Sequence, residues 1–159
     1  MKMNRFIILM SGLLVLSISA CDNKCNVDCF TPPGELALKI TDIDDGADLI
    51  YTGVYNADSL AIYYFGNNSS GIKRYIILEV QTDSARQSSF IISNDISWKS
   101  VEGFKDFYLY LNYQETDTLF YDVVSKTEDC CTYHPIMSFS INGNDVEYDN
   151  TDYTYDLKK

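Results

Sequence analysis

The sequence predicts an all-β fold, an antiparallel β-sandwich of about eight or nine short strands. Apolar residues recur at every second position in short runs, and Asp, Asn and Gly residues separate these runs. The chain contains 13 Tyr and 8 Phe but only 3 Pro, a composition that favours strands. No stretch sustains the apolar period of a helix.

In the first half of the domain, the alternation predicts strands over residues 36–41, 49–54, 60–65, 75–80 and 89–93. An acidic turn around Asp45-Gly46 separates the first two strands, and the polar loop 67–71 precedes the fourth. In the fourth strand we expect Ile76, Leu78 and Val80 to face the core.

In the second half, strands are predicted over residues 107–113, 118–124, 137–141 and 146–148, followed by a final edge strand through Tyr153, Tyr155 and Leu157. Residues 142–145 form a hairpin turn. Segments 83–87 and 98–104 hold at most a helical turn or two. The pattern is Ig-like or transthyretin-like in general appearance, and a closed barrel is the main alternative.

An export signal occupies the start of the chain. Lys2 and Arg5 precede an apolar run over residues 6–18, which is shorter than the roughly 20 residues that a membrane-spanning helix needs. Ile18-Ser19-Ala20-Cys21 resembles a bacterial lipobox, which implies cleavage before Cys21, a diacylglyceryl thioether on the Cys21 sulfur and a fatty acyl group such as palmitate on the new N-terminus. The alternative is an ordinary signal cut after Ser19, with Cys21 a thiol.

We therefore divide the chain into a signal peptide (residues 1–20), a tether (21–34) and one β-sandwich domain (35–159). The tether begins with the predicted lipid attachment residue Cys21, carries Cys25 and Cys29, and ends at Pro32-Pro33, which favours an extended backbone.

The charge is strongly acidic, with 12 basic and 23 acidic residues and a net charge of −11. Nucleic acid is excluded as a partner on this basis, because phosphate binding requires clustered Lys and Arg. An acidic surface is also repelled by anionic lipid, so we expect the membrane to be a partner only through acyl chains on Cys21.

Several features together resemble the small, mostly uncharacterised outer-membrane or cell-surface lipoproteins of Bacteroidota. They are the signal, the Cys25 and Cys29 tether ending in Pro-Pro, the early Asp-Gly turn, and Cys130-Cys131 followed by an Asn-Gly hairpin. The polar residues after Cys21 are similar to a surface-display signal of that group. The resemblance implies an outer-membrane location, on the periplasmic side or exposed at the cell surface, and it implies no catalytic motif.

Four cysteines besides Cys21 are predicted to form disulfides, because exported proteins fold in oxidising compartments. Cys130 and Cys131 are poor partners for each other, since adjacent α-carbons lie about 3.8 Å apart. Two pairings remain: Cys25 with Cys130 and Cys29 with Cys131, or the crossed arrangement. A zinc site that adds His134 is the alternative, but adjacent strand residues point to opposite faces.

No residue is predicted to be catalytic, and neither a cofactor nor a metal is expected. His134 is the one histidine, lies in none of the common triad or zinc-protease motifs, and is interpreted as a strand-end residue. Acidic clusters occur at residues 42–48 and 145–152. The first superficially resembles a calcium loop, but Gly46 comes one position early and no Glu closes the loop, so hairpin turns explain it better.

The candidate binding face is aromatic. Alternation places Phe104, Tyr108 and Tyr110 on the side of their strand opposite the core residues, with Tyr75 on a neighbouring strand. Exposed rings could stack on sugars or anchor a protein, but a face covered by a loop is the favoured interpretation.

Three Asp-Ser/Thr-apolar triplets match the O-glycosylation pattern of exported Bacteroidota proteins, with Ser59, Ser84 and Thr118 as acceptors. We expect modification only where these residues lie at exposed strand ends.

The sequence thus predicts a lipid-anchored envelope protein that is not an enzyme and acts as a binding or accessory module for a glycan or protein partner. The alternative is a purely structural, envelope-maintenance lipoprotein with no small ligand.

Overall fold

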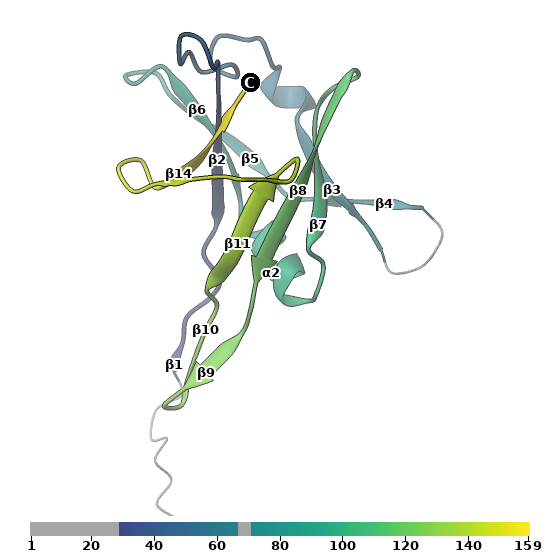
Figure 1. The fold of residues 1–159 in the computed structure, drawn as a ribbon, viewed down its shortest axis with the longest axis vertical. Helices are drawn as coiled ribbons and strands as arrows, with labels where there is room; N and C mark the ends of the chain where they lie inside the picture. Colours follow the sequence, from purple (N-terminus) through teal and green to yellow (C-terminus); the bar gives the residue numbers. More distant parts are fainter. Residues whose placement is uncertain (1–28, 67–70) are drawn as a thin grey trace, which may run out of the picture.

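The computed structural model describes residues 29–66 and 71–159, which form an all-β sandwich (Figure 1). Nine strands of four or more residues and five shorter segments make three open sheets within this part of the chain. The six-stranded and five-stranded sheets pack together as the sandwich body. The three-stranded sheet projects from one end of the body as a narrow stem.

The six-stranded sheet is antiparallel throughout. In spatial order its strands are β12 (Asn144–Asp145), β11 (Ile136–Ile141), β8 (Glu115–Val123), β7 (Asp106–Asn112), β3 (Ala61–Phe65) and β4 (Lys73–Ile76). A tight turn joins β7 to β8, where the backbone N–H of Gln114 donates to Asn112 Oδ1 over 2.8 Å.

The predicted β-sandwich is confirmed, but one pair of strands in the five-stranded sheet is parallel and not antiparallel as predicted. Its order is β13 (Tyr148–Asp149), β14 (Thr154–Lys158), β2 (Leu36–Thr41), β6 (Ser88–Ser93) and β5 (Glu79–Asp83). The last strand, β14, runs parallel to β2, with Tyr155 opposite Leu38. β14 is not an edge strand, because β13 pairs with its other side.

The stem consists of β1 (Cys29–Phe30), β10 (Cys131–Tyr133) and β9 (Lys126–Glu128). β1 pairs with β10 in parallel, with Cys29 opposite Cys131. Two residues of the predicted tether, Cys29 and Phe30, therefore belong to a sheet.

The core lies between the two large sheets. Leu36, Leu38 and Ile40 of β2 are fully buried on one side, and Leu109 and Leu119 on the other, as the alternation predicts. Both sheets are open, so the barrel alternative is wrong. A short 3₁₀ helix, η1 (Ala57–Ser59), precedes β3, and α2 (Asp95–Val101) packs against β8.

Three predicted strands are wrong. The predicted strand 146–148 is absent, because residues 146–147 are in no strand and separate β12 from β13, which belong to different sheets. Residues 49–54 form turns, because the buried carboxylate of Asp48 accepts hydrogen bonds from the N–H groups of Ile50 and Tyr51 and winds the chain. The predicted strand 75–80 is broken between β4 and β5, which belong to different sheets. At the break, the N–H of Ile77 donates to Asp95.

Candidate functional site

Four aromatic side chains lie together on the outer face of the six-stranded sheet, away from the core. They come from three adjacent strands: Tyr63 and Phe65 from β3, Tyr75 from β4 and Tyr108 from β7. The strand register produces this arrangement, because Tyr63 pairs directly with Tyr75 on one side and with Tyr108 on the other. We call these four residues the aromatic cluster.

Tyr63 is the centre of the aromatic cluster. Its ring centroid lies 5.2 Å from that of Tyr108 in a stacked arrangement, 5.8 Å from that of Phe65 and 6.0 Å from that of Tyr75. The ammonium of Lys73 lies 4.1 Å from the Tyr63 ring centroid, a cation–π distance. The cluster is thus held in place by ring–ring contacts and by one cation.

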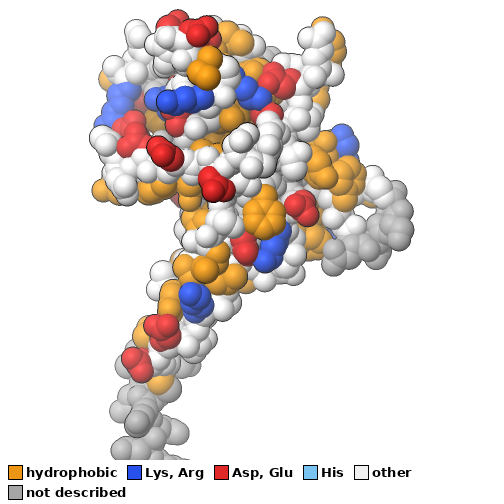
Figure 2. Space-filling model, viewed as in Figure 1, with side chains coloured by type: hydrophobic (Ala, Val, Ile, Leu, Met, Phe, Trp, Pro, Cys, Tyr) orange, Lys and Arg blue, Asp and Glu red, His pale blue; other side chains and the backbone are white. Residues whose placement is uncertain are grey.

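The rings differ in how far they reach solvent. Tyr63 is 7% exposed, whereas Phe65 is 39% and Tyr75 is 66% exposed. On the other face of the same strand, Ile62 and Tyr64 are buried against the core. In Figure 2, hydrophobic side chains gather on the flank that carries β3 and β4, with a basic side chain beside them. The outer surface of the cluster is therefore open to a ligand.

The predicted binding face is only partly correct. Tyr108 belongs to the aromatic cluster, and Tyr110 lies beside it, half-buried and opposite Ala61. Phe104 does not belong to this face, because its ring packs 4.6 Å from Tyr64 and against the core. The favoured interpretation, in which a loop covers this face, is wrong for Tyr75, because its side chain is largely exposed. The prediction missed Tyr63 and Phe65, whose run Ala-Ile-Tyr-Tyr-Phe has no polar residue to mark the outer face.

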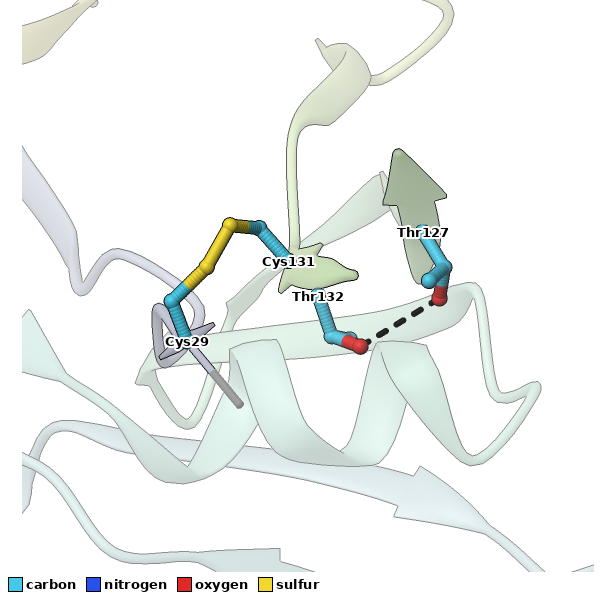
Figure 3. The surroundings of a disulfide bond; sticks show 4 residues. All are labelled: Cys29, Thr127, Cys131 and Thr132. Atoms are coloured by element: carbon cyan, nitrogen blue, oxygen red, sulfur yellow. Dashed lines mark hydrogen bonds between the residues drawn. A yellow bond between two sulfur atoms is a disulfide. The ribbon is translucent and has the colours of Figure 1, made fainter. Parts of the chain in front are cut away.

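The stem carries the disulfide Cys29–Cys131, which is one of the bonds in the first of the two predicted pairings (Figure 3). Beside it, the hydroxyls of Thr127 and Thr132 lie 3.2 Å apart across β9 and β10. Cys130 is also disulfide-bonded, whereas Cys21 and Cys25 lie outside the described residues. Cys29 and Cys131 are not available as thiolate ligands, so the zinc alternative fails.

An aromatic joint connects the stem to the body. The Phe30 ring of β1 lies 6.1 Å from Trp98 of α2 and 5.4 Å from His134. His134 is buried after the end of β10, where its Nδ1 lies 2.8 Å from the carbonyl oxygen of Thr31. Its interpretation as a strand-end residue is correct, and its contacts are structural.

The first acidic cluster stabilises turns. Asp42 Oδ1 accepts the N–H groups of Asp44 and Asp45, and Asp45 Oδ1 accepts that of Ala47. Asp48 is only 4% exposed and also accepts from the backbone N–H of Ser89 over 2.8 Å. These carboxylate oxygens are bonded to the chain itself. Within residues 29–66 and 71–159, no group of three or more acidic, His or Cys side chains is placed to hold a metal.

The second acidic cluster surrounds an open, polar cavity of about 870 Å³ beside β13 and β14. Asp145, Glu147, Asp149 and Asp156 line it together with Lys158 and Lys159. Hydrogen bonds from Thr151 hold the pKa of Asp149 below its ordinary value. The mixed charges give this cavity no clear preference for a cation or an anion.

A network of charged side chains lies at the C-terminal end of β14. The Lys159 ammonium donates to Glu115 Oε1 over 2.6 Å and to Asp117 Oδ1 over 2.8 Å, and the Tyr55 hydroxyl donates to Glu115 Oε2. Burial opposes ionisation of Glu115, but these bonds outweigh it and lower its pKa. Burial likewise opposes the charge of Lys159, whose bonds raise its pKa. Asp117 Oδ2 is buried without a hydrogen-bond partner, but it lies 2.7 Å from the Lys159 ammonium as an ion pair. The charged groups of the network bind one another, so we interpret it as structural.

The three predicted glycosylation residues are exposed but differ in setting. Ser84 lies at the exposed turn between β5 and β6, and Ser59 ends η1 with its hydroxyl donating to the carbonyl of Asn56. Thr118 lies within β8, not at a strand end, between the buried residues Asp117 and Leu119. Ser84 is the best presented of the three.

Comparisons of the chain with protein-family models, with curated proteins and with solved structures found no match. In the part of the chain that the structure describes, no helix has the length and apolar character needed to cross a membrane.

Proposed function

We propose that this chain is a lipid-anchored protein of the bacterial cell envelope that acts as a non-enzymatic binding module for a glycan or a protein. The lipobox-like end of the signal, with lipid on Cys21, supports the anchor. The aromatic cluster supports the binding role, because Tyr75 and Phe65 expose their rings on a sheet face that no other described sheet covers.

The physical reason is the cost of leaving rings in water. Clustered, exposed aromatic side chains are uncommon on monomeric proteins and mark contact surfaces for sugars and protein partners. Here, Tyr63 holds the neighbouring rings in fixed positions, so a ligand would meet an ordered surface.

A purely structural role is the second candidate, and one observation favours it. Tyr63 is nearly buried, with Lys73 over its ring, so part of the cluster stabilises the sheet without any ligand. The structural role predicts that nothing contacts Tyr75 in the cell.

Site-specific photo-crosslinking separates the two roles. We would replace Tyr75 with p-benzoylphenylalanine, whose ketone inserts into C–H bonds of sugars and proteins alike, and irradiate intact cells. Tyr113, an 84% exposed tyrosine in the β7–β8 turn, provides the matched control. The binding role predicts a covalent adduct from position 75 and none from position 113, detected by mass spectrometry. Absence of an adduct at position 75 would favour the structural role.

The anchor is tested separately. We expect Cys21→Ser to move the protein from the membrane fraction to the soluble fraction, because each buried methylene of an acyl chain contributes about 0.8 kcal/mol. Intact-mass measurement should show the lipid on the unaltered chain only. Digestion of intact cells by added protease then distinguishes surface display from a periplasmic location.

A further inference from the structure

The strand β4 is an open edge of the six-stranded sheet. The sheet order ends with β4, and no described strand pairs with it on the side away from β3. In Figure 1 the β3–β4 hairpin extends sideways from the body of the sandwich. An edge strand of this kind presents unpaired backbone N–H and C=O groups, which can accept a further strand.

The hairpin also lacks cover on both faces. Lys73, Arg74 and Tyr75 are all exposed, although successive residues of a strand point to opposite sides. The second sheet therefore does not extend beneath this part of β4. The Arg74 side chain lies over Gly66, the residue after β3, where a Cβ would lie 3.0 Å from Arg74 Nε. The guanidinium therefore lies beside the hairpin.

The side chains at this edge combine apolar surface with positive charge. Ile72 and Ile77, which flank β4, are 65% and 79% exposed, and Tyr75 lies between them. Lys73 and Arg74 form an adjacent basic pair in a chain that has almost twice as many acidic as basic residues. The edge therefore matches an extended segment in which acidic and apolar side chains alternate.

We propose that β4 is a docking strand for an acidic, extended segment of another protein, which adds to the six-stranded sheet beside it. This inference rests on the proposed binding function and names the class of partner. The added segment would gain backbone hydrogen bonds from β4, ion pairs with Lys73 and Arg74, and apolar contact with Tyr75.

A second copy of the chain is a poor occupant of the same edge. Pairing two β4 strands would place four basic side chains along one junction, where like charges destabilise cross-strand pairs. The two chains would also each bring a net charge of −11. The basic pair therefore protects the edge against self-pairing while it attracts an acidic segment.

The test uses the full chain in non-ionic detergent and a fluorescent peptide of about eight residues in which Glu alternates with Val or Thr. Two matched peptides serve as probes of mechanism: one with Lys in place of Glu, and one N-methylated at alternate residues to remove backbone donors. We expect binding of the acidic peptide alone, with each change weakening it at least about tenfold. Equal binding of the N-methylated peptide would overturn the added strand.

Variants and amide exchange locate the contact. Lys73→Glu/Arg74→Glu should weaken binding at least about tenfold, whereas Lys126→Glu/Lys158→Glu, with the same change in net charge on other strands, should not. The peptide should slow hydrogen exchange of β4 amides and leave those of β5, an edge strand of the other sheet, unchanged. Thermal unfolding of both double variants serves as the control that each of them is folded.

Three further outcomes contradict the proposal. They are equal weakening by the two double variants, protection of β5 in place of β4, and a peptide-free dimer in analytical ultracentrifugation that Lys73→Glu/Arg74→Glu abolishes. The last outcome would make a second copy the occupant. Failure here together with a cross-linked glycan at Tyr75 would leave the proposed binding function intact and remove only this class of partner.

Discussion

Two of the aromatic groups in the described residues have similar internal geometry and different surroundings. In the core, the Phe139 centroid lies 5.4 Å from Tyr121 and 4.6 Å from Tyr155, both edge to face. In the aromatic cluster, Tyr63 lies 5.8 Å from Phe65, also edge to face. The core rings lie between two sheets, whereas the outer rings have a sheet on one side only.

This difference teaches that ring–ring contacts alone do not reveal whether an aromatic group serves folding or binding. Rings enclosed by two layers lose water on both sides and contribute their full transfer free energy to stability. Rings supported from one side contribute less and keep surface for a ligand. Four measurements can sharpen or break this distinction.

The largest effect is expected in the core. Phe139→Ala should lower the free energy of unfolding by about 3–5 kcal/mol, because it leaves a cavity between the sheets. Urea unfolding followed by tyrosine fluorescence measures the change. Phe139→Leu, which retains most of the volume, should cost under about 1.5 kcal/mol. The distinction fails if Phe139→Ala costs less than the loss of an outer ring.

Alkaline pH tests the enclosure of Tyr121. Burial raises the pKa of Tyr121 to about 12, although a hydrogen bond with Ser97 opposes the shift. A raised folded-state pKa gives stability that is complete below the unfolded value of about 10 and is lost as pH rises towards 12. We expect the unaltered protein to lose up to roughly 2–3 kcal/mol more than Tyr121→Phe over this range.

Denaturant unfolding of both proteins at several pH values measures this difference. Parallel pH curves for the unaltered protein and Tyr121→Phe would show that the Tyr121 hydroxyl is accessible to water.

The centre of the outer cluster should show an intermediate effect. Tyr63→Ala is expected to cost about 1–2.5 kcal/mol, because the ring is nearly buried but packed from one side. Tyr63→Phe retains the ring and provides the control in the same thermal unfolding experiment. A cost of Tyr63→Ala equal to that of Phe139→Ala would assign the outer cluster to folding.

The smallest effect is expected at the rim. Tyr75→Ala should change the free energy of unfolding by less than about 0.5 kcal/mol, because the side chain is mostly in solvent. The same variant should weaken binding of the acidic peptide, as measured by fluorescence anisotropy. A destabilised Tyr75→Ala protein with unaltered peptide binding would reverse the assignment.

Much of the sandwich could be predicted from alternation, because residues such as Leu36, Leu38 and Ile40 mark one face clearly. The failures occur where a side chain redirects the backbone. Asp48 binds two following N–H groups and prevents the predicted strand 49–54. The parallel pairing of β14 with β2 depends on contacts between distant parts of the chain, which a local pattern cannot encode.

The aromatic site was only partly predictable for a similar reason. Tyr108 follows the alternation of β7, but Phe104 lies before the strand begins at Asp106. Gly103, with φ +102°, turns the chain there. The alternation of inward and outward side chains along β7 therefore does not apply to Phe104. Tyr63 and Tyr75 become neighbours through the pairing of β3 with β4, and the sequence does not specify that register.

The parallel pairing of β2 with β14 also bears on the order of folding. β2 pairs with β6 on one side. On its other side it pairs with β14, which lies more than a hundred residues further along the chain. Contacts so distant in sequence slow the search for the native state. During synthesis, β2 stays open on one side until Thr154–Lys158 have been made, so the five-stranded sheet is completed only after that segment is present.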